Sequence, residues 1–179
     1  MRELESKRLL LRRFQKEDAE NIFTTWASDP EVTKYLTWPA HETVETTKRI
    51  LSIWLNDYEK EGCYRYAICQ KESGRLMGMI DVVSYMDGNP VIGYVLGRAY
   101  WNQGYMTEAF SVVIEELFEA GFSCIKIEAD ERNLGSNAVI LKNGFTFLGK
   151  EKRICSAFKP YEVTVNWYER RREDVLSCM

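Results

Sequence analysis

Residues 92–109 read IGYVLGRAYWNQGYMTEA, and this stretch predicts a strand, a tight loop and the start of a helix. The first N–H groups of such a helix have no partners inside it, and the helix dipole is positive there. This kind of helix end accepts phosphate oxygens; Gly104 lets the backbone come close, and Thr107 adds a hydroxyl. The stretch therefore predicts an anion site. The alternative is that Thr107 or Asn102 caps the helix and Gly104 only forms the turn.

Outward from this stretch, the pattern predicts a single α/β domain over residues 1–179. Apolar residues at helical spacing indicate helices, and short apolar or alternating runs between turn residues indicate strands. The expected helices cover residues 16–27, a short piece from Pro30, and residues 43–60, 105–120 and 136–143. The expected strands cover residues 8–14, 63–69, 76–84, 91–96, 123–130, 145–153 and 161–168, with turns at 72–75 and 87–90.

The charge balance argues against nucleic acid as the main partner. The chain carries 24 Lys and Arg against 27 Asp and Glu, a formal net charge of −3, so it has no basic excess to neutralise a phosphate backbone. No apolar run approaches the roughly 20 residues of a membrane helix, and the charged N-terminus has no apolar signal-peptide core. The sequence therefore predicts a soluble, cytoplasmic protein with no membrane partner.

Cysteine and histidine usage gives no sign of a metal site. The five cysteines, which include Cys178 near the C-terminus, show no C-x-x-C spacing, and His41 is the only histidine. Reduced thiols fit this pattern better than a disulfide framework or a zinc site. A hydrolase of the Ser-His or Cys-His kind would have to use His41, which is expected in a loop.

The opening stretch resembles the coenzyme-binding motif of the GNAT superfamily of N-acetyltransferases, above all its Rim-type branch, the ribosomal-protein N-terminal acetyltransferases. That branch has I-G-Y-x-L in a strand and W-G-x-G-Y-x-T-E-A in the following loop and helix, and residues 92–96 and 101–109 match it. Further family patterns are matched at residues 8–12, 17–19, 127–129 (Ile-Glu-Ala), 133–136 (Asn-x-x-Ser) and 143–145 (Asn-Gly-Phe). Asn102 replaces the glycine of the branch and Met106 is bulkier than usual, but both keep their backbone donors.

The resemblance implies a fold and a cosubstrate. The implied fold is one GNAT-like domain with a mixed, mostly antiparallel, twisted sheet of about six to seven strands, flanked by helices and with a splayed central strand pair. The implied cosubstrate is acetyl-CoA, without a metal. The sequence does not fix the oligomeric state and leaves a monomer and a homodimer open.

The resemblance also assigns coenzyme residues. In that family, free backbone groups of the splayed strand pair with the pantetheine arm, as a sheet edge accepts a further strand. The N–H groups of residues 102–107 would hold the pyrophosphate. The coenzyme residues implied for this chain are Tyr94, Val95, Leu96, Asn102, Gln103, Gly104, Tyr105, Met106, Thr107, Asn133 and Ser136.

The implied reaction is direct attack by a neutral amine on the thioester. At pH 7 a lysine side chain is only about 0.04% neutral and an α-amino group about 10%, so a general base helps both. Glu128 is the expected base, directly or through water, and Asp81 is the second candidate. A backbone N–H near Val95 would stabilise the oxyanion. Glu128 could instead be a surface residue of an alternating strand.

Ser136 and Asn133 match family residues near the thioester sulfur and the coenzyme. Either could instead have a local role, Ser136 as a helix cap and Asn133 in a turn. Ile140 occupies the position of the tyrosine acid of other GNAT branches, so no such acid is expected there.

The acceptor stays open between a protein N-terminus and a small amine. Tyr35, Trp38, Trp54 and Tyr85 could line an acceptor cleft, or could pack in the core. Two alternatives remain to the acetyltransferase hypothesis. One is a non-catalytic acyl-CoA-binding or sensor module of the same fold, and the other is a hydrolase that pairs His41 with a cysteine.

Overall fold

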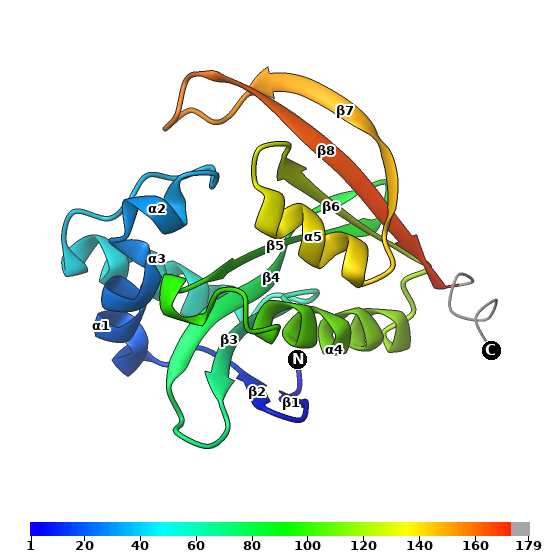
Figure 1. Cartoon of the computed structure of the whole chain (residues 1–179). Coiled ribbons are helices and arrows are strands. Elements are labelled where there is room, and N and C mark those ends of the chain that lie inside the picture. Colours follow the sequence, from blue (N-terminus) through cyan, green and yellow to red (C-terminus); the bar gives the residue numbers. More distant parts are fainter. Residues whose placement is uncertain (173–179) are drawn as a thin grey trace.

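The computed structural model describes residues 1–172, which form one eight-stranded sheet with helices packed against it (Figure 1). The strand order is β1-β2-β3-β4-β5-β6-β8-β7, and only the β5–β6 pair is parallel among the described strands. The strands are β1 (Leu4–Glu5), β2 (Leu9–Arg12), β3 (Arg65–Gln70), β4 (Leu76–Met86), β5 (Asn89–Leu96), β6 (Cys124–Asp130), β7 (Thr146–Ile154) and β8 (Glu162–Arg171). The α-helices are α1 (Ala19–Ile22), α2 (Pro30–Thr33), α3 (Val44–Asp57), α4 (Tyr105–Glu119) and α5 (Leu134–Lys142). The mixed, mostly antiparallel sheet is thus confirmed.

The first predicted helix is broken into different helical types. Residues 16–27 form a 3-10 turn, the short helix α1 and a π-helical turn at Phe23–Ala27. The π turn ends where the Ser28 backbone N–H and hydroxyl both donate to the Phe23 carbonyl, at 3.1 and 2.7 Å. The sheet also has one strand more than expected, because β1 is only two residues long and too short to leave a periodic pattern.

Two further element boundaries differ from the predicted ones, for reasons that are local in sequence. Helix α5 begins at Leu134 and not at Ser136, because the Asn133 side chain accepts the Ser136 backbone N–H at 3.1 Å and so caps the helix. The turn between β4 and β5 is shorter than predicted, with Asn89 already in strand β5.

Two hydrophobic cores lie on the two faces of the sheet. Along β5, successive side chains point to opposite faces: Ile92 packs in one core with Phe110 of α4, and Val95 packs in the other with Trp26. The first core holds α4 and part of α5, and the second holds α1, the π turn and Leu51 of α3.

The parallel pair β5–β6 is splayed, as predicted. Its register contains only Val91 opposite Lys126 and Ile92 opposite Ile127. Beyond these pairs, residues 93–96 are bonded to β4 alone, so a gap opens between β5 and β6 at their C-terminal ends. Ends of parallel strands that diverge in this way are where open α/β sheets bind ligands.

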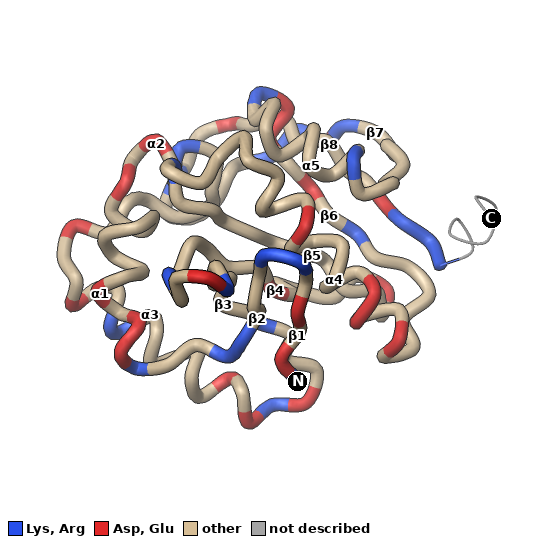
Figure 2. The backbone as a smooth tube through the Cα atoms, turned by 60° about the horizontal axis from the view of Figure 1, so that its bottom comes forward, with Lys and Arg blue, Asp and Glu red and all other residues tan. Residues whose placement is uncertain are grey.

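The surface carries mixed charge. Basic and acidic segments alternate along the chain, with no face of a single sign in the view of Figure 2. Within residues 1–172 no cysteines are bonded to each other and no cluster of metal-ligating side chains is found; Cys178 lies outside the described residues. No helix in the described part of the chain has both the length and the apolar character needed to cross a membrane.

Candidate active site

The loop before α4 presents unpaired backbone donors. Gly104 is the N-cap of α4, with a left-handed φ of 78°, and no side chain caps the helix. Among the described residues no acceptor is found for the N–H groups of residues 102–107. The alternative that Thr107 or Asn102 caps the helix is therefore wrong. Asn102 also has a positive φ, 59°, which helps to turn these N–H groups outward from the helix end.

Side-chain contacts hold this loop in shape. The Trp101 indole donates to the Leu96 carbonyl at 2.7 Å, and the Gln103 amide donates to the Ala99 carbonyl at 2.8 Å. Arg8 lies over the Tyr105 ring and donates to the Gln103 carbonyl at 3.1 Å. Met106 is buried in the core, so of this residue only the backbone faces the loop. These contacts fix the positions of the backbone donors.

Glu108 fastens the N-terminal segment to the helix start. Its carboxylate accepts from the Ser6 hydroxyl, the Arg8 backbone N–H and the Arg8 guanidinium, each at 2.7 Å. These three bonds outweigh the effect of burial and lower the pKa of Glu108. A carboxylate so fully occupied has a structural role.

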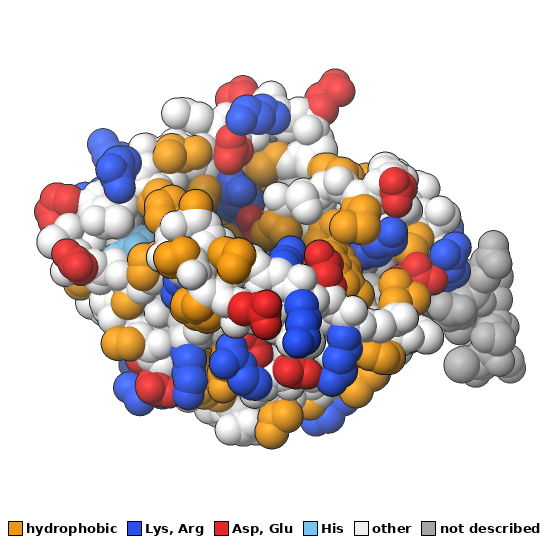
Figure 3. Space-filling model, turned by 90° about the horizontal axis from the view of Figure 1, so that it is seen from above, with side chains coloured by type: hydrophobic (Ala, Val, Ile, Leu, Met, Phe, Trp, Pro, Cys, Tyr) orange, Lys and Arg blue, Asp and Glu red, His pale blue; other side chains and the backbone are white. Residues whose placement is uncertain are grey.

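A cleft of about 600 Å³ lies at the splay (Figure 3). Its lining includes Ile92 and Ile127 from the α4 core and Trp26 and Val95 from the other core. The cleft therefore reaches both faces of the sheet through the gap between β5 and β6.

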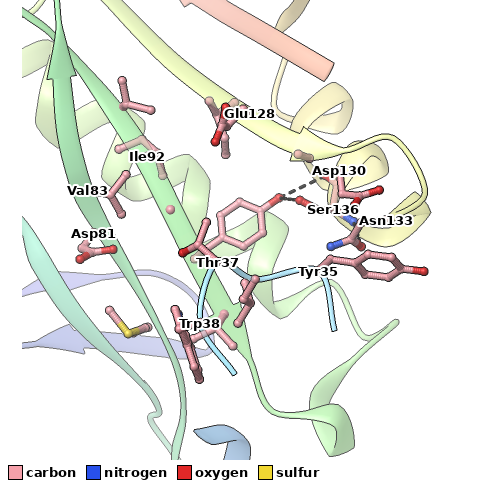
Figure 4. Close-up of a pocket in the computed structure, with 18 of the residues that line it drawn as sticks. Tyr35, Thr37, Trp38, Asp81, Val83, Ile92, Glu128, Asp130, Asn133 and Ser136 are labelled. Atoms are coloured by element: carbon pink, nitrogen blue, oxygen red, sulfur yellow. Dashed lines mark hydrogen bonds between the residues drawn. The ribbon is translucent and has the colours of Figure 1, made fainter. Parts of the chain in front are cut away.

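The two candidate bases lie in this cleft on adjacent strands. Asp81 of β4 is opposite Gly93 of β5, and Glu128 of β6 follows Ile127, which pairs with Ile92. In the strand register Asp81, Gly93 and Glu128 therefore lie at the same level. Figure 4 shows Asp81 and Glu128 in the cleft, with Val83 and Ile92 between them. A Cβ at Gly93 would come within 2.6 Å of a Val83 methyl group, so glycine is needed here for the Val83 side chain to pack against β5.

Glu128 is half-buried, and only one of its two carboxylate oxygens has a hydrogen-bond partner within residues 1–172. Its Oε1 pairs with the Arg153 guanidinium, while its Oε2 is buried and has no hydrogen-bond partner among the described residues. Burial raises the pKa of Glu128, and Arg153 opposes that rise. Glu128 thus lines the cleft with one carboxylate oxygen bound by Arg153 and the other without a partner in the described part of the chain.

Asp81 is more deeply buried than Glu128. Its carboxylate is bound by Arg65 Nε at 3.0 Å, and Arg65 also binds Asp57 at 3.0 Å. Burial raises the pKa of Asp81 to about 6, although Arg65 lowers it. Asp81 thus has a pKa suited to a base, and like Glu128 it has one carboxylate oxygen bound by an arginine.

Asp81 should make the fold less stable as the pH rises. Its folded pKa of about 6 lies above its ordinary 3.8, so its contribution to the free energy of unfolding is complete below pH 3.8 and is lost through about pH 6. Between pH 5 and 7.5 that loss is about 1 kcal/mol. Urea unfolding of wild type and Asp81→Asn at both pH values measures it. Relative to wild type, the free energy of unfolding of Asp81→Asn should rise by this amount between the lower and the higher pH. A difference between the two proteins that does not change with pH would contradict the raised pKa of Asp81.

Ser136 lies in the cleft beside the Tyr94 hydroxyl (Figure 4). The Tyr94 hydroxyl donates to the Ser136 carbonyl at 3.1 Å, and its oxygen lies 2.9 Å from Ser136 Oγ. Asn133 is the helix cap, so the prediction of Ser136 as a cap is wrong. Burial raises the pKa of Tyr94, which keeps this phenol protonated and able to donate.

The sequence motifs do not assign a role to the Tyr94 hydroxyl. They imply only that the Tyr94 backbone contacts the coenzyme, and they place the tyrosine acid of other branches at Ile140, which is fully buried. The signal available was the strand alternation, because Tyr94 shares the face of Ile92, the face against which α5 packs.

Three of the four aromatic residues considered for a cleft lie in the lining of this one. Tyr35, Trp38 and Trp54 line the cleft. Tyr85 does not: its hydroxyl donates to the Gly62 carbonyl at 2.9 Å, and its ring lies against Phe122.

His41 does not form a catalytic pair with a cysteine. It lies in a loop at the cleft, with Nδ1 2.8 Å from the Thr47 hydroxyl, and burial lowers its pKa. Cys155 also lines the cleft, but its sulfur lies 3.9 Å from the Leu36 carbonyl, and no hydrogen bond between His41 and a cysteine exists within residues 1–172. The structure gives the hydrolase hypothesis no support.

The chain is similar to known proteins over most of its length. The family model described as "Acetyltransferase (GNAT) domain" matches residues 8–146. A protein of Bacillus licheniformis named uncharacterized N-acetyltransferase p20 is 31% identical over 153 residues, which cover 82% of this chain and 83% of that protein.

Solved structures share the fold at lower identity. The RimL ribosomal L7/L12 alpha-N-protein acetyltransferase, in complex with coenzyme A, has a TM-score of 0.83 at 20% identity and covers 95% of this chain and 98% of its own. The microcin C7 self-immunity acetyltransferase MccE, in complex with acetyl-CoA and AMP, has a TM-score of 0.82 at 20% identity and covers 93% of both chains.

Proposed function

The chain is an acetyltransferase that belongs to the GNAT family, and we propose that it moves the acetyl group of acetyl-CoA to a primary amine by direct attack. The observation that carries this proposal is the set of unpaired N–H groups at residues 102–107, directly beside the splayed end of β5. Backbone donors at a positive helix end suit a pyrophosphate. We expect residues 1–179 to act as one domain.

The proposed coenzyme position follows from these donors. With the pyrophosphate on the N–H groups of residues 102–107, the pantetheine arm would run along residues 94–96, whose outward backbone groups have no strand partner beyond Ile92. The thioester would then reach the cleft between β5 and β6, near Ser136. Asn133, which caps α5, would support the arm mainly by fixing Ser136.

Glu128 is the proposed base because it lines the cleft at the splay and its Oε2 has no hydrogen-bond partner among the described residues. The amine nitrogen must lose a proton to Glu128, directly or through a water molecule, so that its lone pair can attack the carbonyl carbon. The C–N bond forms, the C–S bond breaks, and the CoA thiolate leaves. A raised pKa on a buried carboxylate brings the base closer to the pKa of an amine, which favours this transfer.

The Tyr94 and Ser136 hydroxyls are proposed to act together on the leaving sulfur. Tyr94→Phe and Ser136→Ala should each lower kcat by roughly 5- to 50-fold, because each removes one hydroxyl of a bonded pair. The double variant should be about as slow as the slower single variant, since the two groups act as one unit. Steady-state kinetics at saturating acetyl-CoA measures this, and fully multiplicative losses would argue against a coupled pair.

Thiol release from acetyl-CoA in the presence of amines tests the function. A panel should include small amines and peptides with free N-termini, and calorimetry should measure acetyl-CoA binding separately. We expect tight binding of acetyl-CoA and amine-dependent release of CoA with an acetylated product. Binding without turnover on any amine would leave a coenzyme-binding module, and absence of binding would overturn the proposal.

A further inference from the structure

The part of the cleft that faces α2 and α3 has an aromatic and apolar wall. The indoles of Trp26, Trp38 and Trp54 line it, together with Leu36 and Met79. Trp26 is fully buried, and Trp38 and Trp54 are partly exposed. In the space-filling view hydrophobic side chains surround the hollow (Figure 3). This wall can cover an apolar body but offers few hydrogen bonds to a polar one.

The proposed base fixes which end of an acceptor lies at the splay. The acidic residues of the lining, Asp81, Glu128 and Asp130, are each paired with an arginine: Arg65, Arg153 and Arg132. Asp81 and Glu128 lie on either side of Gly93, at the point where the wall ends. An amine that gives its proton to Glu128 would therefore lie at the splay, with its carbon body against the indoles.

A strap closes one side of this compartment. The tip of the β7–β8 hairpin, residues 155–161, reaches the segment after α2: Lys159 Nζ donates to the Thr33 and Lys34 carbonyls at 2.6 and 3.3 Å. The Ser156 hydroxyl donates to the carbonyl of Thr37, a residue of the cleft lining. The hairpin tip thus holds part of the cleft wall in place.

We propose that the acceptor is a small primary amine with an aromatic or bulky apolar body, and not a peptide N-terminus or a polyamine. The inference rests on the proposed function and narrows its acceptor. A peptide would leave its backbone N–H and C=O groups unpaired against the indole wall, and a polyamine would bury a second ammonium there; both are unfavourable. The strap adds a steric barrier on the side that it covers.

The test compares four acceptors on the wild-type enzyme: 2-phenylethylamine, n-propylamine, spermidine and a hexapeptide with an N-terminal serine. We expect kcat/KM for 2-phenylethylamine to exceed that for n-propylamine by about 30-fold or more, the factor that follows from removing roughly 80 to 100 Å² of aryl surface from water. Spermidine and the peptide should be poorer still than 2-phenylethylamine. Equal values for the two monoamines, or a better value for spermidine or the peptide, would overturn the inference.

Single variants test whether the aromatic wall and the hairpin tip determine the acceptor preference. Trp38→Ala should lose most of the preference in kcat/KM for 2-phenylethylamine over n-propylamine, whereas Phe158→Ala, at an aromatic residue 77% exposed on the hairpin tip, should keep that preference. Lys159→Met should raise turnover of the peptide relative to wild type. Lys150→Met is its control, because Lys150 on the same hairpin pairs with Glu131 and does not line the cleft. An unchanged preference in Trp38→Ala would refute the wall.

Failure of this inference can be told apart from failure of the proposed function. Binding of acetyl-CoA, measured by calorimetry, with turnover of spermidine or the peptide but not of apolar amines, would leave the acetyltransferase function standing and reject the apolar acceptor. No turnover on any of the four acceptors, or no binding of acetyl-CoA, would reject the proposed function itself.

Discussion

Replacing Gly104 by tryptophan should weaken acetyl-CoA binding by at least about 100-fold, near 3 kcal/mol. Gly104 has a left-handed φ of 78°, which side-chain-bearing residues rarely adopt, and a Cβ there would lie 3.5 Å from the Arg8 guanidinium. The indole would cover the N–H groups of residues 102–107 and displace Arg8 from its contact with the loop. Calorimetric titration with acetyl-CoA measures the loss.

Gly88→Trp is the matched control for this experiment. Gly88 has nearly the same φ, 76°, and a Cβ there meets nothing within 4 Å. It lies in the turn between β4 and β5, so it carries the same backbone strain without reaching the coenzyme loop. The control should fold and bind acetyl-CoA as wild type does. Undiminished binding by Gly104→Trp would show that the loop does not hold the coenzyme.

Replacing Glu128 by glutamine should lower kcat by about 100- to 1,000-fold and leave acetyl-CoA affinity unchanged, because the variant keeps the shape of the side chain and removes its capacity to accept a proton. In the wild type the base is active when deprotonated, so kcat should rise with pH through the pKa of Glu128. Burial places that pKa above its ordinary 4.5, and the variant should lose this limb of the profile. Steady-state kinetics from pH 5 to 9 tests both expectations.

Two companion variants make the result specific. Glu131→Gln removes a carboxylate that pairs with Lys150 outside the cleft, and it should leave kcat unchanged. Asp81→Asn should lower kcat less than Glu128→Gln, because Asp81 lies on β4, one strand away from the splay between β5 and β6. Equal rates for wild type and Glu128→Gln would remove Glu128 from the mechanism. If Asp81→Asn alone were slow, the base would be Asp81.

The sequence could predict the elements whose causes are local. Helix α4 and its loop follow from Gly104 and the apolar spacing behind it, and the observed α4 starts at the predicted Tyr105. The alternation in residues 124–130 places Ile125 and Ile127 in the core and leaves Glu128 on the other face. Where neighbours in sequence decide the conformation, the pattern is enough. The prediction of one continuous helix failed at residues 16–27. There the hydroxyl of Ser28 donates to the Phe23 carbonyl at the end of a π turn, which apolar spacing does not reveal.

The site itself depended on contacts that are distant in sequence. Asp81 and Glu128 meet in one cleft only because the register of three strands brings both to the level of Gly93. The Arg153 partner of Glu128 comes from β7, and the Tyr94 hydroxyl reaches Ser136 on α5, 42 residues later. The chain alone therefore determined the loop of unpaired donors at residues 102–107, since a helix end carries its donors with it. Burial, ion pairing and the shape of the acceptor compartment were decided by tertiary packing, because each is a property of groups that only the folded sheet brings together.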